Sequence, residues 1–352
     1  MKKLSNREII KKYFANCLPY EVIIELTEDC NLSCVHCNRV KGKKFISIDE
    51  YKFILNELKK LGTYRVFFTG GEPTINPDFL DIIDLTIKEK FFFSIQTNGT
   101  NITNELIKKL KPTKFFSSMQ ISLYGSNEKI YRKVTQQKNF FKKVINNIEK
   151  CKNAGFKIIL KSLISKLNYD DIENLEKLGK KFNVFHKFDF TIFPRDDGNL
   201  DYQNLRVSFD DLIKYQLRLY SNYTKEEIIK SLKSNRHLKK YLNTNICNAG
   251  ITKMCITANG ELLSCNAFRK SFGNIFKYGL INLWKNSDEL NQLRKLKLKN
   301  FKKCVNCNLL KYCNSKCIGL FYAENNSIFI PSEFRCTLQA LYLDIIKKHY
   351  II

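Results

Sequence analysis

The chain has 352 residues, of which 44% are hydrophobic and 27% are charged, so it can form a core and is not a wholly disordered chain. No apolar run approaches the roughly 18 residues of a membrane-spanning helix, so we expect no membrane contact. The 60 Lys and Arg outweigh the 34 Asp and Glu by 26 charges. The basic residues are spread along the chain and form no stripe interleaved with aromatics, which disfavours nucleic acid as a partner.

The first residues, "MKKLSNREIIKKYFANC", predict a short amphipathic helix. Lys11 and Lys12 interrupt the segment that would be the apolar part of a signal peptide. We therefore expect a cytoplasmic protein. In a reducing compartment the 13 cysteines are expected to bind metal or to do redox chemistry, and their odd number argues against a complete disulfide framework.

Strand-like and helix-like patterns alternate through the first 195 residues. Strands are expected at 21–27, 64–69, 91–97, 115–123, 156–164 and 186–193, with helices between them at 47–61, 77–90, 103–110, 127–154 and 170–182. Ser47 and Glu50 form a capping-box pattern, and Gly62 fits just past the end of that helix. Strands joined by helices predict a parallel sheet, either as a barrel or as an open sheet.

The alternation stops at "PRDDGN", residues 194–199, and a charged helical stretch follows to about residue 245. Eight of the 13 cysteines lie from Cys247 onward. We therefore predict a core domain at 1–205, a helical linker at 206–245 and a small cysteine-rich domain at 246–352.

The segment "CNLSCVHC" places Cys30, Cys34 and Cys37 directly after the first strand, at the carboxyl end of the sheet, where ligand sites gather in α/β folds. His36 could complete a zinc site with these thiols, whereas three thiolates alone suit a 4Fe–4S cluster with one open iron. The second strand ends in "TGGEP". There Gly70 and Gly71 permit close backbone approach, Glu72 adds an acceptor and Pro73 stiffens the turn, which suits an ammonium group.

Together the two motifs resemble those of the radical S-adenosylmethionine (SAM) superfamily. The resemblance implies a partial, TIM-like (β/α)6 barrel in which Cys30, Cys34 and Cys37 hold a 4Fe–4S cluster and His36 is not a ligand. It also implies that the "GGEP" turn, Gly70 to Pro73, holds the amino group of SAM, and that the cluster's electron releases a 5′-deoxyadenosyl radical. The ends of the third and fourth strands would contact the ribose and the methionine carboxylate, with Asn98 and Ser122 as the candidates.

The spacing of the C-terminal cysteines, together with the segment 273–286, resembles the α+β SPASM domain, which carries two auxiliary 4Fe–4S clusters. The resemblance therefore implies three 4Fe–4S clusters in all. The implied ligands of the second auxiliary cluster are Cys304, Cys307, Cys313 and Cys336, and those of the first are Cys247, Cys265 and Cys317.

The fourth ligand of the first auxiliary cluster depends on a predicted hairpin. Asn259-Gly260 is a two-residue turn signal that pairs Ala258 with Glu261. In that register Cys255 points away from Cys265, unless a bulge intervenes. We therefore expect an open iron that could bind a substrate thiolate.

The resemblance favours an enzyme that modifies a peptide or protein, such as a precursor peptide, with thioether formation as one reaction and a flavodoxin- or ferredoxin-type electron donor. An anaerobic sulfatase-maturating enzyme, which generates formylglycine, is a second hypothesis. That group has Gln before "GGEP" and a catalytic Asp after the GxxxxC cysteine, where this chain has Thr69 and Asn266. A small-molecule substrate and a non-catalytic or tRNA-directed iron–sulfur protein are further alternatives.

Overall fold

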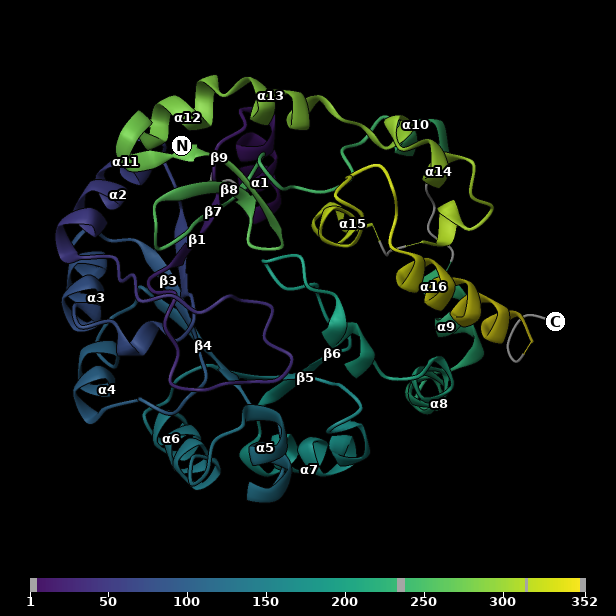
Figure 1. Ribbon diagram of the computed structural model, residues 1–352, viewed down its shortest axis with the longest axis horizontal. Coiled ribbons are helices and arrows are strands. Elements are labelled where there is room, and N and C mark those ends of the chain that lie inside the picture. Colours follow the sequence, from purple (N-terminus) through teal and green to yellow (C-terminus); the bar gives the residue numbers. More distant parts are fainter. Residues whose placement is uncertain (1–4, 233–237, 314–315, 349–352) are drawn as a thin grey trace. The chain divides into compact units, whose positions relative to one another are not determined.

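The structure, a computed structural model, describes residues 5–232, 238–313 and 316–348 (Figure 1). The chain forms two compact units, one of Met1–Arg206 with Asn248–Asn291 and one of Val207–Cys247 with Gln292–Ile352. These units group residues by packing, whereas the sequence-based domains group them by motif, so the predicted domain bounds stay a prediction. None of the described helices is long and apolar enough to cross a membrane.

The first unit is built on a sheet with the strand order β6-β5-β4-β3-β2-β1-β7-β8-β9. Strands β1 to β6 are all parallel, which confirms the predicted α/β architecture. Strands β6 and β9 lie at the two edges, so the barrel is open. The parallel strands are β1 (Glu21–Glu25), β2 (Arg65–Thr69), β3 (Phe92–Thr97), β4 (Phe116–Ser122), β5 (Ile158–Leu163) and β6 (Phe185–Asp189).

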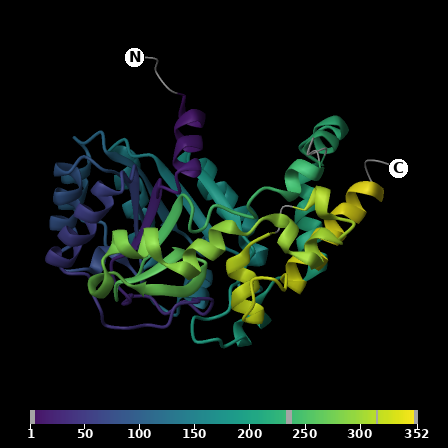
Figure 2. The same ribbon diagram turned by 90° about the horizontal axis from the view of Figure 1, so that it is seen from above.

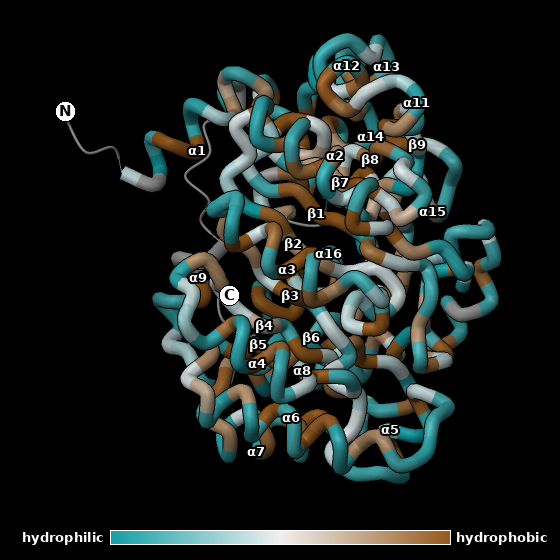
Figure 3. The backbone as a smooth tube through the Cα atoms, turned by 90° about the vertical axis from the view of Figure 1, so that its left-hand side faces the viewer, coloured by the Kyte–Doolittle hydropathy of each residue, from teal (hydrophilic) through white to brown (hydrophobic). Residues whose placement is uncertain are grey.

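Helices cover the outer side of this sheet (Figures 1 and 2). They are α2 (Ile48–Lys60), α3 (Phe79–Lys88), α4 (Asn104–Leu110), α6 (Phe141–Asn153) and α7 (Ile172–Phe182), and α1 (Asn6–Ala15) precedes the first strand. The strand side chains facing these helices are apolar and almost fully buried, among them Val22, Ile24, Val66 and Phe68. In Figure 3 the central strands β1 to β3 are largely brown, whereas the helices alternate between brown and teal, as expected when each helix buries one face.

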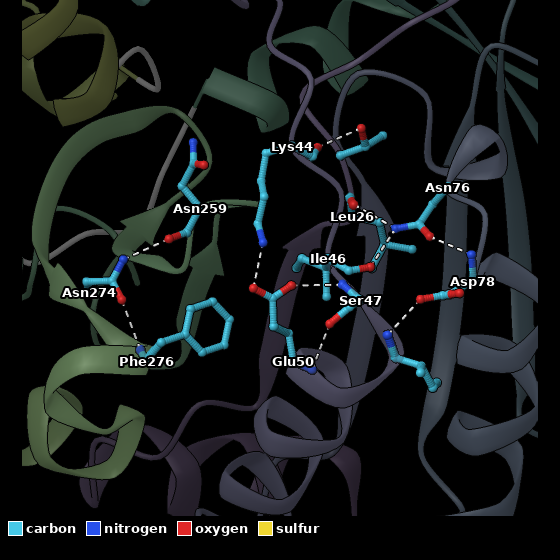
Figure 4. Close-up of polar contacts among 12 residues, drawn as sticks. Leu26, Lys44, Ile46, Ser47, Glu50, Asn76, Asp78, Asn259, Asn274 and Phe276 are labelled. Carbon is cyan, nitrogen blue, oxygen red and sulfur yellow. Dashed lines mark hydrogen bonds and ion pairs between the residues drawn. The ribbon is translucent and has the colours of Figure 1, made fainter.

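Helix α2 begins as the sequence predicts. The Ser47 hydroxyl accepts from the Glu50 amide at 3.2 Å, and the Glu50 carboxylate accepts from the Ser47 amide at 2.8 Å (Figure 4). The prediction of one helix over 127–154 is wrong, because α5 (Glu128–Thr135) and α6 are separate helices. Gln136 and Asn139 between them adopt left-handed backbone angles of φ 59° and 68°, which a continuous helix does not allow.

The C-terminal part of the chain returns to the first unit, which the sequence did not indicate. Strand β7 (Lys253–Ile256) pairs in parallel with β1, and β8 (Glu261–Cys265) and β9 (Phe268–Asn274) continue the sheet as antiparallel strands. Helices α11 (Ile275–Tyr278), α12 (Leu280–Asn286) and α13 (Asp288–Lys295) follow. The indole of Trp284 donates to the carbonyl oxygen of Cys17 at 2.8 Å and so ties α12 to the segment before β1.

The predicted register of the β7–β8 hairpin is wrong by one residue. Cys255 pairs with Leu263, and the Thr257 amide donates to the carbonyl oxygen of Glu261 at 3.0 Å, which leaves a three-residue loop. Gly260 has φ 80°, but Asn259 is not among the residues with positive φ, so the two-residue type I′ turn is not formed. A shift of one residue reverses the faces, and Cys255 therefore lies on the same face as Cys265.

The second unit is mainly helical. It contains α8 (Phe209–Tyr220), α9 (Lys225–Leu232), α10 (Leu238–Leu242), α14 (Lys302–Val305), α15 (Ile318–Asn325) and α16 (Glu333–Ile346). Helix α8 packs on α16, with the rings of Phe209 and Phe334 stacked at 5.3 Å between centroids. The predicted helical stretch at 206–245 thus joins the C-terminal helices in one compact unit.

Candidate functional site

The cysteine loop, residues 26–46, leaves β1 and returns beside it. The Asn76 side-chain amide donates to the carbonyl oxygens of both Leu26 and Ile46 at 2.9 Å (Figure 4). The Glu28 amide also donates to the Lys44 carbonyl oxygen at 3.1 Å. Because both ends of the loop are held by one buried side chain, the thiols between them are carried on a closed loop.

Gly70 and Gly71 let the loop pack directly on the end of β2. A Cβ at Gly70 would lie 2.4 Å from the carbonyl oxygen of Thr27, and one at Gly71 would lie 2.0 Å from that of Asp29. The amides of Gly71 and Glu72 donate to these same two carbonyl oxygens at 2.8 and 2.9 Å. The glycines are therefore required first by contact with the cysteine loop, in addition to any contact with a ligand.

A cavity of about 310 Å³ lies at the carboxyl ends of the parallel strands. It brings together residues that the sequence predicts as metal ligands and as SAM contacts. These lining residues are Cys30, Cys34, Cys37, Gly70, Gly71, Asn98 and Ser122. Glu72 and Pro73 do not line the cavity and are buried beneath it.

Glu72 is held by hydrogen bonds from neighbouring residues of the protein. Its side chain is fully buried, and its carboxylate accepts from the Thr97 hydroxyl at 2.6 Å, the Asn98 amide at 2.5 Å and both the amide and the hydroxyl of Thr74. Burial raises the pKa of Glu72, and these hydrogen bonds partly offset that shift. The carboxylate thus joins the ends of β2 and β3, and the predicted role of Glu72 in holding the amino group of SAM stays a prediction.

The three thiols of the cysteine loop lie close enough to affect one another. Burial raises the pKa of Cys30 to about 11, with Cys37 contributing, and burial raises that of Cys34 further, with Cys37 and Cys30 contributing. Without a metal the thiols of Cys30 and Cys34 keep their protons at neutral pH, so binding a cluster releases protons. The side-chain amide of Asn98 points to this loop and donates to the Asn31 side chain at 2.8 Å.

His36 is buried beside the cysteines, and its ring packs edge-on against Tyr124 at 4.6 Å between centroids. Burial lowers the pKa of His36 to about 4, so the imidazole is neutral. Within the described part of the chain, no three His, Cys, Asp or Glu side chains converge on a single metal-ion position. Thiolates around a four-iron cube do not need to converge on one point.

A closed ring of four charged side chains, of which Glu25 is buried and the others are partly exposed, lies beside the cavity. Glu25 pairs with Arg39 at 2.6 Å and with Arg269 at 2.8 Å, and Asp196 pairs with the same two arginines at 3.2 and 3.1 Å. The ring joins β1, the cysteine loop, the segment after β6, and β9. Burial alone would raise the pKa of Glu25, but the two arginines outweigh it and hold that pKa below its ordinary value. The Cys255 thiol donates to Glu25 at 3.7 Å.

Sequence reasoning missed the wall of the cavity formed by β5 and β6. Lys161 and Lys187 line it, with Gln96 from β3 and Asp189 at the end of β6. The available signal was strand alternation, because Ser122 pairs with Lys161, and Lys161 with Lys187, in the sheet register. All these side chains therefore share the face that carries the predicted Ser122.

In the second unit the structure brings together Cys304, Cys307, Cys313 and Cys336. Burial and the thiols of Cys336, Cys313 and Cys307 raise the pKa of Cys304 to about 11. Burial and the thiols of Cys313 and Cys307 likewise raise the pKa of Cys336. Short helices and turns carry the first three cysteines, and α16 carries the fourth, so one site gathers thiols far apart in the sequence.

The predicted ligands of the first auxiliary cluster fall in both units. Cys265 belongs to the first unit, and Cys247 and Cys317 belong to the second, so their assignment stays a prediction. Cys151 is fully buried against the sulfur of Met119 at 3.7 Å, as expected for a packed thiol.

Comparison with protein families identifies this arrangement. The profile of the radical SAM superfamily matches residues 24–179, and that of the SPASM iron–sulfur cluster-binding domain matches residues 247–308. The chain is a radical SAM enzyme with a SPASM domain. Radical SAM and SPASM proteins use SAM and iron–sulfur clusters, and the cysteine-lined cavity provides a suitable donor set.

Relatives of this radical SAM enzyme carry several activities. The mycofactocin maturase MftC of Mycolicibacterium smegmatis is 27% identical over 84% of this chain and 77% of its own length. The AdoMet-dependent heme synthase of Methanosarcina barkeri is 24% identical over 90% of this chain and 96% of its own length. Among solved structures, Streptococcus suis SuiB bound to the precursor peptide SuiA has a TM-score of 0.70 at 20% identity, covering 95% of this chain and 82% of SuiB. This last likeness shows a shared fold.

Proposed function

We propose that this radical SAM enzyme modifies a ribosomally made precursor peptide. The observation that carries the proposal is the cavity in which Cys30, Cys34 and Cys37 face the Gly70-Gly71 turn, in a chain that matches the SPASM domain. A maturase among its relatives and a fold shared with a protein bound to a precursor peptide support a peptide as the substrate.

When bound by the three thiolates, a 4Fe–4S cluster supplies the electron that cleaves SAM to methionine and a 5′-deoxyadenosyl radical. The chain itself positions the reactants. The backbone of Gly70 and Gly71 presents the turn that would receive the amino group of SAM. The Glu72 carboxylate accepts from the backbone amide of Asn98 and so holds Asn98 in place. Asn98 and Ser122 line the same cavity, where they would bind the ribose and the methionine carboxylate.

The structure bears on two predicted reactions. Thr69 and Asn266 both line the cavity, so the two departures from the sulfatase-maturating pattern lie at the site itself, where an amide cannot accept a proton as a carboxylate does. Formylglycine generation is therefore disfavoured. The corrected hairpin register also removes the reason for expecting an open iron, and with it the reason for favouring thioether formation over other peptide modifications.

We further propose three 4Fe–4S clusters, one in the cysteine loop and two auxiliary. Cys255 becomes the candidate fourth ligand of the first auxiliary cluster, because it shares a strand face with Cys265 and that thiol affects its pKa. A flavodoxin- or ferredoxin-type protein would supply the electrons.

A second candidate is a small-molecule substrate. The heme synthase relative matches over 96% of its own length, so an enzyme of this size in the family need not act on a peptide.

The test uses the anaerobically reconstituted protein with SAM, a reductant and a short peptide encoded beside its gene. A mass change in the peptide that needs SAM, and is lost when Cys30, Cys34 and Cys37 are replaced together by Ala, would support the proposal. Cleavage of SAM with no modification of any neighbouring peptide, together with conversion of a small metabolite, would favour the second candidate.

A further inference from the structure

Tyr131 of α5 is fully buried, yet its hydroxyl has no hydrogen-bond partner within the part of the chain that the structure describes. A buried hydroxyl without a partner is unfavourable, because it has lost its hydrogen bonds to water. Phenylalanine has the same ring and would avoid that cost. Tyr51, which is equally buried, pairs its hydroxyl with that of Thr86 at 2.6 Å. The unpartnered hydroxyl of Tyr131 therefore requires an explanation.

The helix that carries Tyr131 packs on the cysteine loop. The amides of Ser33 and Val35 donate to the carbonyl oxygens of Thr135 and Val134, at 3.1 and 3.0 Å. Tyr131, Val134 and Thr135 are the buried residues of α5, and their spacing of three and four residues places them on one face of the helix. Tyr131 thus lies on the buried face of α5, one turn before the point at which the cysteine loop attaches.

The cysteine thiols act on Tyr131 electrostatically. Burial raises the pKa of Tyr131, and Cys34, Glu72 and Cys30 raise it further. Because such effects fall with distance, the phenol lies in the same buried region as these thiols. It keeps its proton at neutral pH and is available as a hydrogen-bond donor. Tyr131 is not among the residues that line the cavity, so a ligand bound in the cavity does not explain its hydroxyl.

The sulfur atoms of the cysteine loop are the remaining acceptors in this region. Cys30 already receives N–H groups from the Leu32 amide at 3.5 Å and from the Asn98 side chain at 3.8 Å. A thiol is a weak acceptor, whereas a thiolate carries negative charge and accepts a stronger hydrogen bond. We propose that the Tyr131 hydroxyl donates a hydrogen bond to the sulfur of Cys34 when the cysteine loop holds its cluster.

Such a bond favours the reduced form of the cluster. Reduction adds negative charge to a cluster and its sulfur ligands, and a donor beside a ligand sulfur stabilises that charge and raises the reduction potential. Tyr131 is then a positioning residue that acts through Cys34 and touches neither SAM nor substrate. The inference rests on the proposed cluster in the cysteine loop, and it is independent of the proposed peptide substrate.

The test compares the wild type with Tyr131→Phe by redox titration of the anaerobically reconstituted proteins, followed by electron paramagnetic resonance. The signal of this cluster is the one missing when Cys30, Cys34 and Cys37 are replaced together by Ala. At a fixed potential we expect the ratio of reduced to oxidised cluster to fall about tenfold in Tyr131→Phe, which lowers the potential of a one-electron couple by about 59 mV. Iron content should stay unchanged.

Tyr51→Phe is the matched control, because it removes a buried phenol hydroxyl whose partner, Thr86, lies on α3. It should leave the reduction potential unchanged. Electron–nuclear double resonance gives a second readout, which a merely structural role would not move. The reduced cluster should couple to an exchangeable proton that is present in the wild type and in Tyr51→Phe, is replaced in deuterium oxide, and is absent from Tyr131→Phe.

Either an unchanged potential or a retained exchangeable proton in Tyr131→Phe would overturn the proposal and leave an ordered water as the partner of the hydroxyl. Fewer irons in Tyr131→Phe would also overturn it, because the hydroxyl would then serve the loading of the cluster. These results leave the proposed function intact. A wild type that lacks the signal assigned to the cysteine loop would instead contradict the proposed function, and this inference with it.

Discussion

Replacing Arg269 with Met should destabilise the protein strongly, because it opens the ring formed by Glu25, Arg39, Asp196 and Arg269. The side chain of Glu25 is only 7% exposed, and Arg269 donates to both of its oxygens, at 2.8 and 3.3 Å. Removing one partner of a buried ion pair costs about 3–5 kcal/mol. Since Arg39 still pairs with Glu25, we expect the lower end, about 3 kcal/mol.

The assay is urea unfolding of the reconstituted wild type and variants, with the shift in midpoint converted through the slope of the transition. Lys52→Met is the matched control, because Lys52 pairs with Asp49 at 2.8 Å but both side chains are more than half exposed. Such a surface pair contributes about 0–1 kcal/mol. Replacing Arg39 and Arg269 together should cost more than the sum of the single changes, since Glu25 is then left buried without a partner.

The pH dependence follows from the lowered pKa of Glu25. A carboxyl whose pKa is lowered in the folded state stabilises it fully above the unfolded pKa, near 4.5, and loses this effect as the pH falls through the folded pKa. The difference between wild type and Arg269→Met should therefore be full at neutral pH and shrink in acid. A cost at neutral pH equal to that of Lys52→Met would contradict this prediction.

Three further variants test the site. Glu72→Gln should destabilise the folded protein by about 2 kcal/mol, because an amide nitrogen would face the donors of Thr97 or Asn98. It should also weaken SAM binding with iron content unchanged, and loss of iron would contradict this prediction. Asn76→Ala should cost about 2–3 kcal/mol and lower the iron held by the cysteine loop, since two buried carbonyl oxygens lose their donor. Unchanged iron content and stability would show that Asn76 does not hold the two ends of this loop. If Cys255 is the fourth ligand of the first auxiliary cluster, Cys255→Ala should lose up to about four of roughly 12 irons. Full iron content in this variant would instead support an iron without a cysteine ligand in that cluster.

The sequence predicted the order and type of most elements of the first unit, because its strands and helices carry strong local signals. The capping box at Ser47 and the six parallel strands are examples. The break at Gln136–Asn139 was missed because two left-handed residues there replace the usual Gly or Pro signal. Strand β7 was not placed in the sheet, because its pairing with β1 joins residues about 230 positions apart, as in Ile23 with Cys255.

At the site, sequence motifs indicated the backbone geometry better than they indicated the contacts of individual side chains. The cysteine and glycine motifs fix backbone geometry, and those residues line one cavity. The motif does not reveal that the Glu72 carboxylate accepts from Thr97 and Asn98 at the end of the next strand, and its predicted contact with SAM stays a prediction. The predicted register of the hairpin at Asn259 was wrong because the Asn-Gly dipeptide is compatible with two loop lengths, which place the strand side chains on opposite faces.

We expect the cysteine loop to support reductive cleavage of SAM. The most direct measurement is the formation of 5′-deoxyadenosine by the anaerobically reconstituted protein with SAM and dithionite. We predict formation in the wild type and none in the protein with Cys30, Cys34 and Cys37 replaced together by Ala. A wild type that is loaded with iron yet forms no 5′-deoxyadenosine, or a triple variant that forms as much as the wild type, would contradict the claim.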